Sequence, residues 1–199
     1  MAAGSGFYAD VDEVTLGRAR RGDVAAIETI YRRFATPVYN LGRRLCGSPE
    51  EADDVLQETF LEVVRSVHRF RGDGAFGAWM RQVAASKALA RLRRHASSRE
   101  RAGGDDPGRE RAAEDAAVET RLDLERALAR LNVTARAVVW LHDVEGLTHG
   151  EIASLMDRSE SFSKSQLARA HTRMREWLGR LGSEDHASRD RRAVGAAGR

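Results

Sequence analysis

Two short capping motifs fix where helices begin in this chain, one in each half. Ser48 is followed by Pro49 and then by Glu51, and in the second half Thr148 and Glu151 have the same spacing. A hydroxyl and a glutamate so spaced accept hydrogen bonds from backbone N–H groups of the first helical turn, where proline is also favoured. Apolar residues recur at helical spacing beyond both motifs. The sequence therefore predicts an all-α fold.

The apolar pattern falls into two helical modules rather than one extended core. Between them the chain contains glycine, proline and many charges but no large apolar residue, which is typical of a flexible linker. The predicted order is an N-terminal extension, a first small helical domain, a flexible linker, a second helical domain with a helix-turn-helix, and a disordered tail: 1–22, 23–96, 97–117, 118–181 and 182–199.

The predicted helix ends rest on residues that start or stop helices. Asp23 is a candidate cap for the first helix, which Pro37 is expected to end or kink and Gly47 to stop. In the second domain Thr134 is a candidate cap and Gly146 a candidate end. One face of the first helix is expected to be core: Val24, Ile27, Ile30, Tyr31 and Phe34.

Composition narrows the class of protein. The 199 residues are 42% hydrophobic and 32% charged with a net charge of +3, which allows soluble cores with acidic and basic surfaces sorted along the chain. Cys46 is the only cysteine, so a disulfide framework or a four-cysteine zinc site is excluded. The start lacks the pattern of a signal peptide, and no apolar stretch is long enough to span a bilayer. We therefore expect a cytoplasmic protein without membrane insertion.

Enzyme motifs are missing from the sequence. There is no glycine-rich phosphate loop ending in Lys-Ser/Thr and no HExxH zinc motif. The six histidines, among them His68, His142, His149 and His171, are scattered without ligand spacing, and each is expected at the surface or in packing. We predict no enzyme, no metal and no cofactor.

The helix that follows Pro49 has an acidic second face. Four of its residues lie at i, i+3, i+4 and i+7 and are not needed for core packing: Asp54, Gln57, Glu58 and Leu61. An acidic stripe is most often a solvated face. The exposed leucine instead favours a protein partner with basic residues.

The stretch from Phe70 to His95 joins an aromatic loop around Gly72 and Gly74 to a basic helix. Aromatic faces can stack on unpaired bases, and the apolar stripe of the helix continues into basic residues that suit phosphate. A core helix with a solvated arginine tail is the alternative. The candidates from loop and helix are Phe70, Arg71, Phe76, Lys87, Arg91 and Arg94.

The second domain ends in two helices joined by a polar turn from Asp157 to Glu160, which suggests a helix-turn-helix. Residues on the outer face of the last helix have side chains that can pair with base edges or phosphate. An ordinary helical hairpin remains the alternative. The outer-face candidates are Phe162, Gln166, Arg169 and Arg173, with Lys164 and Ser165 beside the helix start.

In these segments and their order the chain resembles an extracytoplasmic-function (ECF) sigma factor, a bacterial transcription initiation factor. The resemblance lies in EEADDVLQETFLEV and FGAWMRQVAASKALARLRRH in the first domain, and in VVWLHDVEGLTHGEIASLM and SFSKSQLARAH in the second. It implies that the acidic helix docks on the clamp helices of core RNA polymerase. It also implies that the loop and basic helix bind and open the minus-ten element, and that the recognition helix contacts the minus-thirty-five element.

The resemblance assigns three sets of residues. Core polymerase would be bound by Asp53, Asp54, Gln57, Glu58 and Leu61. Minus-ten DNA would be bound and melted by Phe70, Arg71, Phe76, Trp79, Lys87, Arg91 and Arg94. Minus-thirty-five DNA would be bound by Ser161, Phe162, Lys164, Ser165, Gln166, Arg169 and Arg173. The family also implies an anti-sigma factor as partner, and we expect a monomer when the protein is free.

The chain departs from the family pattern at several of these positions. Ser86 and Ala90 replace the usual Asn and Asp of the basic helix, so the minus-ten preference is expected to differ. Ser161-Phe162-Ser163 stands where Gly-Thr-Val is usual, and Gln166 replaces a frequent arginine. Two functions of other classes stay open: a stand-alone helix-turn-helix regulator, which would need a dimerisation surface, and a helical adaptor that binds only protein.

Overall fold

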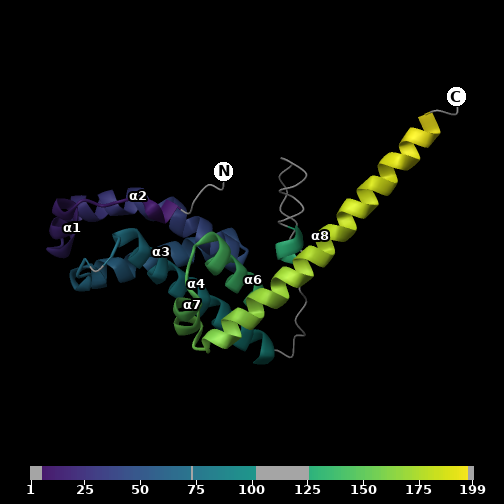
Figure 1. Ribbon diagram of the computed structural model, residues 1–199. Coiled ribbons are helices and arrows are strands. Elements are labelled where there is room, and N and C mark those ends of the chain that lie inside the picture. Colours follow the sequence, from purple (N-terminus) through teal and green to yellow (C-terminus); the bar gives the residue numbers. More distant parts are fainter. Residues whose placement is uncertain (1–5, 73, 102–125, 197–199) are drawn as a thin grey trace.

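The computed structural model describes residues 6–72, 74–101 and 126–196, and this part of the chain contains helices and no strand. The prediction of an all-α fold is confirmed. Figure 1 shows α1 to α4, the first region, gathered on one side. The second region, α6 to α8, begins beside them, and the rest of α8 projects toward the C-terminus. The elements are η1 (Gly6–Tyr8), α1 (Glu13–Arg20), α2 (Val24–Cys46), α3 (Pro49–Ser66), η2 (Val67–Arg69), α4 (Phe76–Arg101), α6 (Val133–Val139), η3 (Trp140–Val144), α7 (His149–Met156) and α8 (Glu160–Ala196).

The predicted helix starts are confirmed by their hydrogen bonds. The Asp23 carboxylate accepts from the backbone N–H groups of Ala25 and Ala26, and the Ser48 hydroxyl accepts from that of Glu51. Thr148 and Glu151 cap each other reciprocally at the start of α7. Because each of these bonds is made within four residues, local sequence was sufficient to predict it.

Several predicted boundaries need correction. The helix does not end at Pro37, because α2 runs on to Cys46 with its buried face continuing through Phe34 and Val38. Asn132, not Thr134, caps α6 by accepting from the N–H of Ala135. The residues 97–101, expected in the linker, belong to α4, and α8 continues to Ala196 through the segment expected to be disordered. The predicted linker residues 102–117 lie outside the described residues.

One face of α2 supplies the centre of the core. Ile30, Phe34, Val38, Leu41 and Leu45 are almost completely buried. Val24 and Tyr31, which were expected on this face, are instead exposed.

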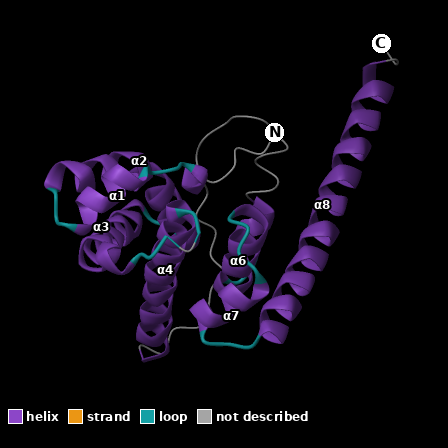
Figure 2. Ribbon diagram, turned by 60° about the vertical axis from the view of Figure 1, so that its left-hand side comes forward, coloured by secondary structure: helices purple, strands orange, loops and turns teal. Residues whose placement is uncertain are grey.

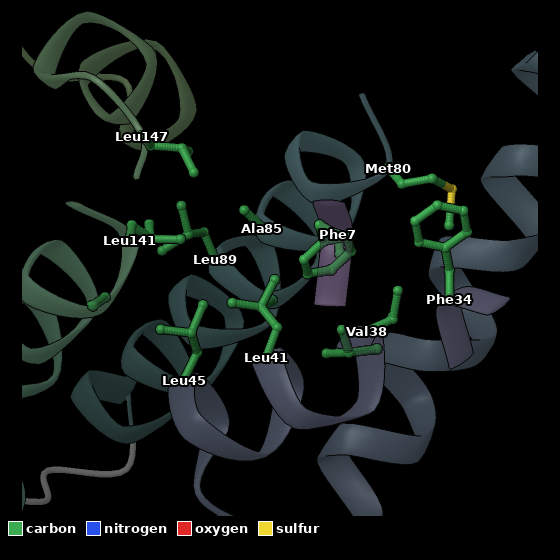
Figure 3. Packing of buried hydrophobic residues seen from close by; sticks show 14 of the residues in the cluster. Phe7, Phe34, Val38, Leu41, Leu45, Met80, Ala85, Leu89, Leu141 and Leu147 are labelled. Carbon is green, nitrogen blue, oxygen red and sulfur yellow. The ribbon is translucent and has the colours of Figure 1, made fainter. Parts of the chain in front are cut away.

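The buried apolar residues form one cluster that spans both regions, which corrects the expectation of separate cores. Figure 3 shows Leu141 of η3 beside Leu89 of α4, with Leu45 and Leu41 of α2 in the same layer. The Arg44 guanidinium lies 5.4 Å from the ring centroid of Trp140. The second region is therefore docked on α2 and α4.

The N-terminal segment is part of this core, which the sequence did not predict. Phe7 is buried, with its ring centroid 6.3 Å from that of Phe34. At Gly77 an added Cβ would lie 1.8 Å from the Phe7 carbonyl oxygen, so only glycine allows this close approach to α4.

Candidate nucleic-acid interface

The helix-turn-helix is formed by α7 and α8 (Figure 2). α7 ends at Asp157, whose φ of 54° turns the chain away from the helix, and α8 begins at Glu160. On α8 the residues facing α6 and α7 are buried: Ser163, Leu167 and Ala170. The prediction of two helices joined by a tight polar turn is confirmed.

The rest of the α8 surface carries the residues predicted to contact minus-thirty-five DNA. Five are exposed (Ser161, Lys164, Ser165, Arg169 and Arg173) and two are half-buried (Phe162 and Gln166). Two of them are held by contacts along the helix: Arg169 Nε donates to the Ser165 carbonyl oxygen at 3.1 Å, and Lys164 lies 3.2 Å from Glu160. The Arg158 guanidinium lies 6.0 Å from the Phe162 ring centroid. The outer face thus presents basic, amide and aromatic groups together.

Behind this face the structure brings together histidines that are scattered in the sequence. His149 Nδ1 lies 2.9 Å from the Ser163 hydroxyl, and the His142 ring stacks on His149 with centroids 4.5 Å apart. His171 Nε2 lies 2.6 Å from an Asp143 carboxylate oxygen. Sequence reasoning missed this group because its members come from three different elements. The only sequence signal was the two histidines on either side of the helix stop at Gly146.

The acidic stripe of α3 and the basic stripe of α4 face each other. Lys87 Nζ lies 2.9 Å from Glu62, Arg91 pairs with both Asp54 and Glu58, and Arg94 lies 3.0 Å from Glu58. Hydrogen bonding to the Lys87 ammonium and its charge lower the pKa of the Glu62 carboxyl. The Arg91 side chain is only 18% exposed, whereas that of Arg94 is 60% exposed. The acidic residues of α3 and the basic residues of α4 were expected to bind other molecules. In this structure they pair with each other.

A groove on α2 and α3 remains open beside these pairs. It has a volume of about 300 Å³ and is lined by Tyr31, Asp53, Leu56, Gln57, Phe60, Leu61 and Val64. Leu61 and Val64 are 49% and 50% exposed, and the Tyr31 ring lies 4.7 Å from that of Phe60. Asp53 and Gln57 are exposed at its edge. This groove contains three of the five predicted polymerase-binding residues.

The loop before α4 carries aromatics that pack on one another. Phe76 is 2% exposed, so it has no free face for a base, which corrects the expectation that it stacks. Phe70 and Trp79 are half-buried and lie 5.7 Å apart between ring centroids. Arg71 is exposed next to Gly72, whose φ is +83°. Only part of the predicted stacking surface is accessible.

Polar residues of α4 that sequence reasoning missed reach the second region. Arg81 donates to the Glu145 carbonyl, Gln82 Nε2 donates to Glu151 at 2.7 Å, and Arg93 donates to the Leu155 carbonyl at 3.0 Å. Of the two positions that depart from the family pattern, Ser86 is exposed and Ala90 half-buried. The helix expected to bind the minus-ten element therefore also holds the helix-turn-helix.

Other kinds of site were sought in the described residues. Among them no group of three or more His, Cys, Asp or Glu is arranged to hold a metal ion. None of the described helices has the length and apolar character needed to cross a membrane.

Both regions match known protein families. Residues 30–98 match Sigma-70 region 2, and residues 121–174 match Sigma-70, region 4. The chain is 35% identical over 162 residues to the ECF RNA polymerase sigma factor SigM of Mycobacterium tuberculosis, covering 80% of this chain and 81% of the relative. It is 32% identical over 174 residues to the ECF RNA polymerase sigma factor SigE of Mycolicibacterium smegmatis, covering 82% of this chain and 66% of that relative.

Two solved structures are similar in fold. The sigma factor RpoE in complex with the anti-sigma factor NepR from Bartonella quintana has a TM-score of 0.58 at 16% identity, covering 78% of this chain and 98% of that one. CnrH in complex with the cytosolic domain of CnrY has a TM-score of 0.54 at 21% identity, covering 85% and 98%.

Proposed function

Because the chain belongs to the ECF RNA polymerase sigma factor family, we propose that it binds core RNA polymerase and directs promoter recognition and strand opening at transcription initiation. It acts as an initiation factor and not as an enzyme. The observation that carries the proposal is the outward face of α8, which follows a capped α7 and the left-handed turn at Asp157. A helix so presented can enter a major groove.

Readout of the minus-thirty-five element falls to Gln166 and Arg169. Gln can pair bidentately with adenine and Arg with guanine. Arg169 is exposed, and Gln166, one turn before the buried Ala170, is half-buried at the edge of the outer face. Arg173 and Lys164 add positive charge that suits phosphate.

Core polymerase binds, in this proposal, at the groove between α2 and α3. Leu61 and Val64 offer apolar surface that nothing in the described chain covers, and Asp53 supplies an exposed negative charge for a basic partner. Asp54 and Glu58 already pair with arginines of α4, so they contribute to the partner's electrostatic attraction less than Asp53.

Minus-ten DNA meets the loop before α4 and the exposed side of that helix. Arg71 and Arg94 are the most accessible of the predicted residues. Phe70 and Trp79 are the aromatics that retain partial exposure, so they receive an unpaired base. An anti-sigma factor is a further partner in this proposal, because one solved structure of similar fold is a complex with the anti-sigma factor NepR and the other is a complex with the cytosolic domain of CnrY.

Transcription with purified core polymerase tests the proposal. The promoter is taken from start-site mapping after overexpression, and Gln166→Ala with Arg169→Ala is compared with the unaltered chain. Loss of one good base contact costs about 1–3 kcal/mol, so output from the double variant should fall steeply. Specific binding of the promoter duplex by the chain alone, with no transcription when core polymerase is added, would instead support the stand-alone regulator.

Arg175→Ala is the matched control. Arg175 is also an exposed arginine of α8, and its Nε donates to the carbonyl four residues earlier just as that of Arg169 does. It lies about 120° from Arg169 around the helix. Equal losses from Arg175→Ala and Arg169→Ala would mean that general positive charge, not the outer face, is read.

For polymerase binding, Leu61→Arg is compared with Val14→Arg. Both replace an exposed apolar residue, but only Leu61 lines the groove. Leu61→Arg should abolish capture of core polymerase and Val14→Arg should not. If both variants still capture core polymerase, the groove is not part of the interface. If only Leu61→Arg loses capture, and transcription is lost with it, the result also argues against an adaptor that binds only protein.

A further inference from the structure

A buried hydroxyl ties the recognition helix to the helix before it. Ser163 is 0% exposed, and within the described part of the chain the one hydrogen-bond partner shown for its hydroxyl is His149, with 2.9 Å between Nδ1 and Oγ. His149 is the first residue of α7. Buried hydroxyls need a partner, so this bond fixes how α7 meets the first turn of α8. Ser163 stands where the family pattern has valine, so the bond belongs to this chain's own sequence.

A second tie holds α8 two turns further along. Asp143 of η3 places one carboxylate oxygen 2.6 Å from His171 Nε2 and the other 2.9 Å from His142 Nδ1. The His142 ring in turn stacks on that of His149, at 22° between planes. These contacts therefore hold α8 at two residues, Ser163 and His171, which lie about 12 Å apart along the helix.

The surroundings of His149 favour the neutral imidazole. The charged and titratable groups near it are His142, Lys164, Glu160 and Asp143. Glu160 and Asp143 favour the protonated form, but their effects on the pKa of His149 are smaller than those of burial, His142 and Lys164. A cation at the first position of α7 also opposes the helix dipole. Burial first, then His142 and Lys164, lower the pKa of His149 from 6.5.

Resting on the proposed role of α8 in reading DNA, we propose that neutral His149 is a positioning residue that orients Phe162 and Gln166 through Ser163, and that its protonation releases the start of the helix. With Nδ1 unprotonated, the Ser163 hydroxyl donates to it. A protonated imidazole can only donate, so the hydroxyl must turn to accept, and its own buried proton loses this acceptor. Since the pKa of folded His149 lies below its ordinary value of 6.5, the positioned state is favoured above about pH 6.5 and weakens as the pH falls below it.

The test measures binding of the full chain to a fluorescent duplex carrying the mapped minus-thirty-five element and to a scrambled duplex, from pH 5.5 to 8. For the unaltered chain, the ratio of specific to scrambled affinity should fall about tenfold between pH 7.5 and pH 5.5, as expected for one lost hydrogen bond in a site that protonates there. His149→Asn keeps an amide at the position of Nδ1 but cannot titrate, so its ratio should stay flat. His68→Asn, in the exposed η2 turn of the first region, should keep the fall of the unaltered chain.

The outcomes separate this inference from the proposed function. A flat ratio for the unaltered chain, or an equal fall in His149→Asn, overturns the positioning role of His149. If His149→Asn does not fold, as judged by circular dichroism, Ser163→Ala removes the same bond and should also give a flat ratio. If Gln166→Ala and Arg169→Ala leave the specific affinity at pH 7.5 unchanged, α8 does not read the element at all, and both proposals fail for that separate reason.

Discussion

The region from α1 to α4 encloses its own core, whereas the region from α6 to α8 completes its core on the surface of the first. In the first region Ile30, Phe34 and Met80 are fully buried among neighbours from η1, α2 and α4. In the second, Leu141 is fully buried and lies beside Leu89 of α4 (Figure 3). Hydrophobic stabilisation grows with the apolar area removed from water. The helix-turn-helix therefore depends on the first region for part of its stability.

Buried polar atoms without a hydrogen-bond partner occur in both regions. In the first region they include Thr59 Oγ1 and Arg91 Nε. Glu145 is 4% exposed, and one of its carboxylate oxygens has no hydrogen-bond partner in the structure. Arg81 Nε and Arg136 Nε, near the boundary between the regions, are likewise buried without a partner. Unsatisfied buried groups are costly, so this cost is carried by both regions as well as by the boundary between them.

The largest loss of stability is expected from Phe34→Ala, which removes a buried ring from the core of the first region. Phe34 is completely buried and contacts Phe7 and Phe76. Truncation of a buried phenylalanine costs about 3–5 kcal/mol, which should unfold both regions because the second is docked on the first. Urea unfolding followed by circular dichroism measures the loss. A second region that keeps its hydrogen-exchange protection in this variant would break the proposed dependence.

A smaller and more local effect is expected from Leu141→Ala. The lost contacts lie at the boundary, where the neighbours can partly relax, so the cost should be near the lower end for such truncations, about 2 kcal/mol. Hydrogen exchange should show protection lost in α6 to α8 and kept in α2. Equal loss in both regions would mean that they unfold as one unit.

The parts of the fold that sequence predicted are those decided within one or two turns. The caps at Asp23, Ser48 and Thr148 and the stop at Gly47 depend on residues at most four positions apart. Prediction failed where distant packing decides the outcome. Phe7 joins the core although no periodic pattern surrounds it, and Tyr31, which was expected on the buried face of α2, is exposed.

In the candidate site, too, features set within one helix were predicted and contacts between helices were not. The outer face of α8 follows from spacing along one helix, and the structure leaves it accessible. The pairing of Arg91 with Asp54 could not be read from either stripe alone, because it depends on how α3 and α4 lie against each other. The contact between His149 and Ser163 depends likewise on the angle between α7 and α8.

Arg91 and Arg94 should separate stability from DNA binding within the charge network. Arg91→Ala leaves Asp54, whose side chain is 48% exposed, without this partner and should cost about 1 kcal/mol. Arg94→Ala should cost less, since its side chain is mostly exposed, but should reduce the salt slope of minus-ten duplex binding by about 0.9 if it contacts phosphate.

Salt titrations by anisotropy and urea titrations on the same preparations measure the two effects. The charge swap Asp54→Arg with Arg91→Asp is the control, because it should recover stability if the pair serves the fold. Recovery of stability without recovery of polymerase capture would show that Asp54 also contacts the partner.

The smallest effect is expected from Glu62→Gln, which removes the partner of Lys87 at the protein surface. The pair is partly exposed, so its contribution is at most about 1 kcal/mol and is weakened by salt. Because the folded pKa of Glu62 lies below the ordinary 4.5, the contribution is present above about pH 4.5 and is lost as the pH falls through the lowered folded value. The difference in unfolding free energy between the unaltered chain and Glu62→Gln should thus be measurable at pH 7 and low salt, and should shrink toward pH 3. The unfolding free energy of His149→Asn should differ from that of the unaltered chain in another range, below about pH 6.5. The two titrations therefore identify which region loses stability as the pH falls. A Glu62→Gln difference that persists unchanged at pH 3 would mean that packing of the side chain, not its charge, stabilises the α3 and α4 pair.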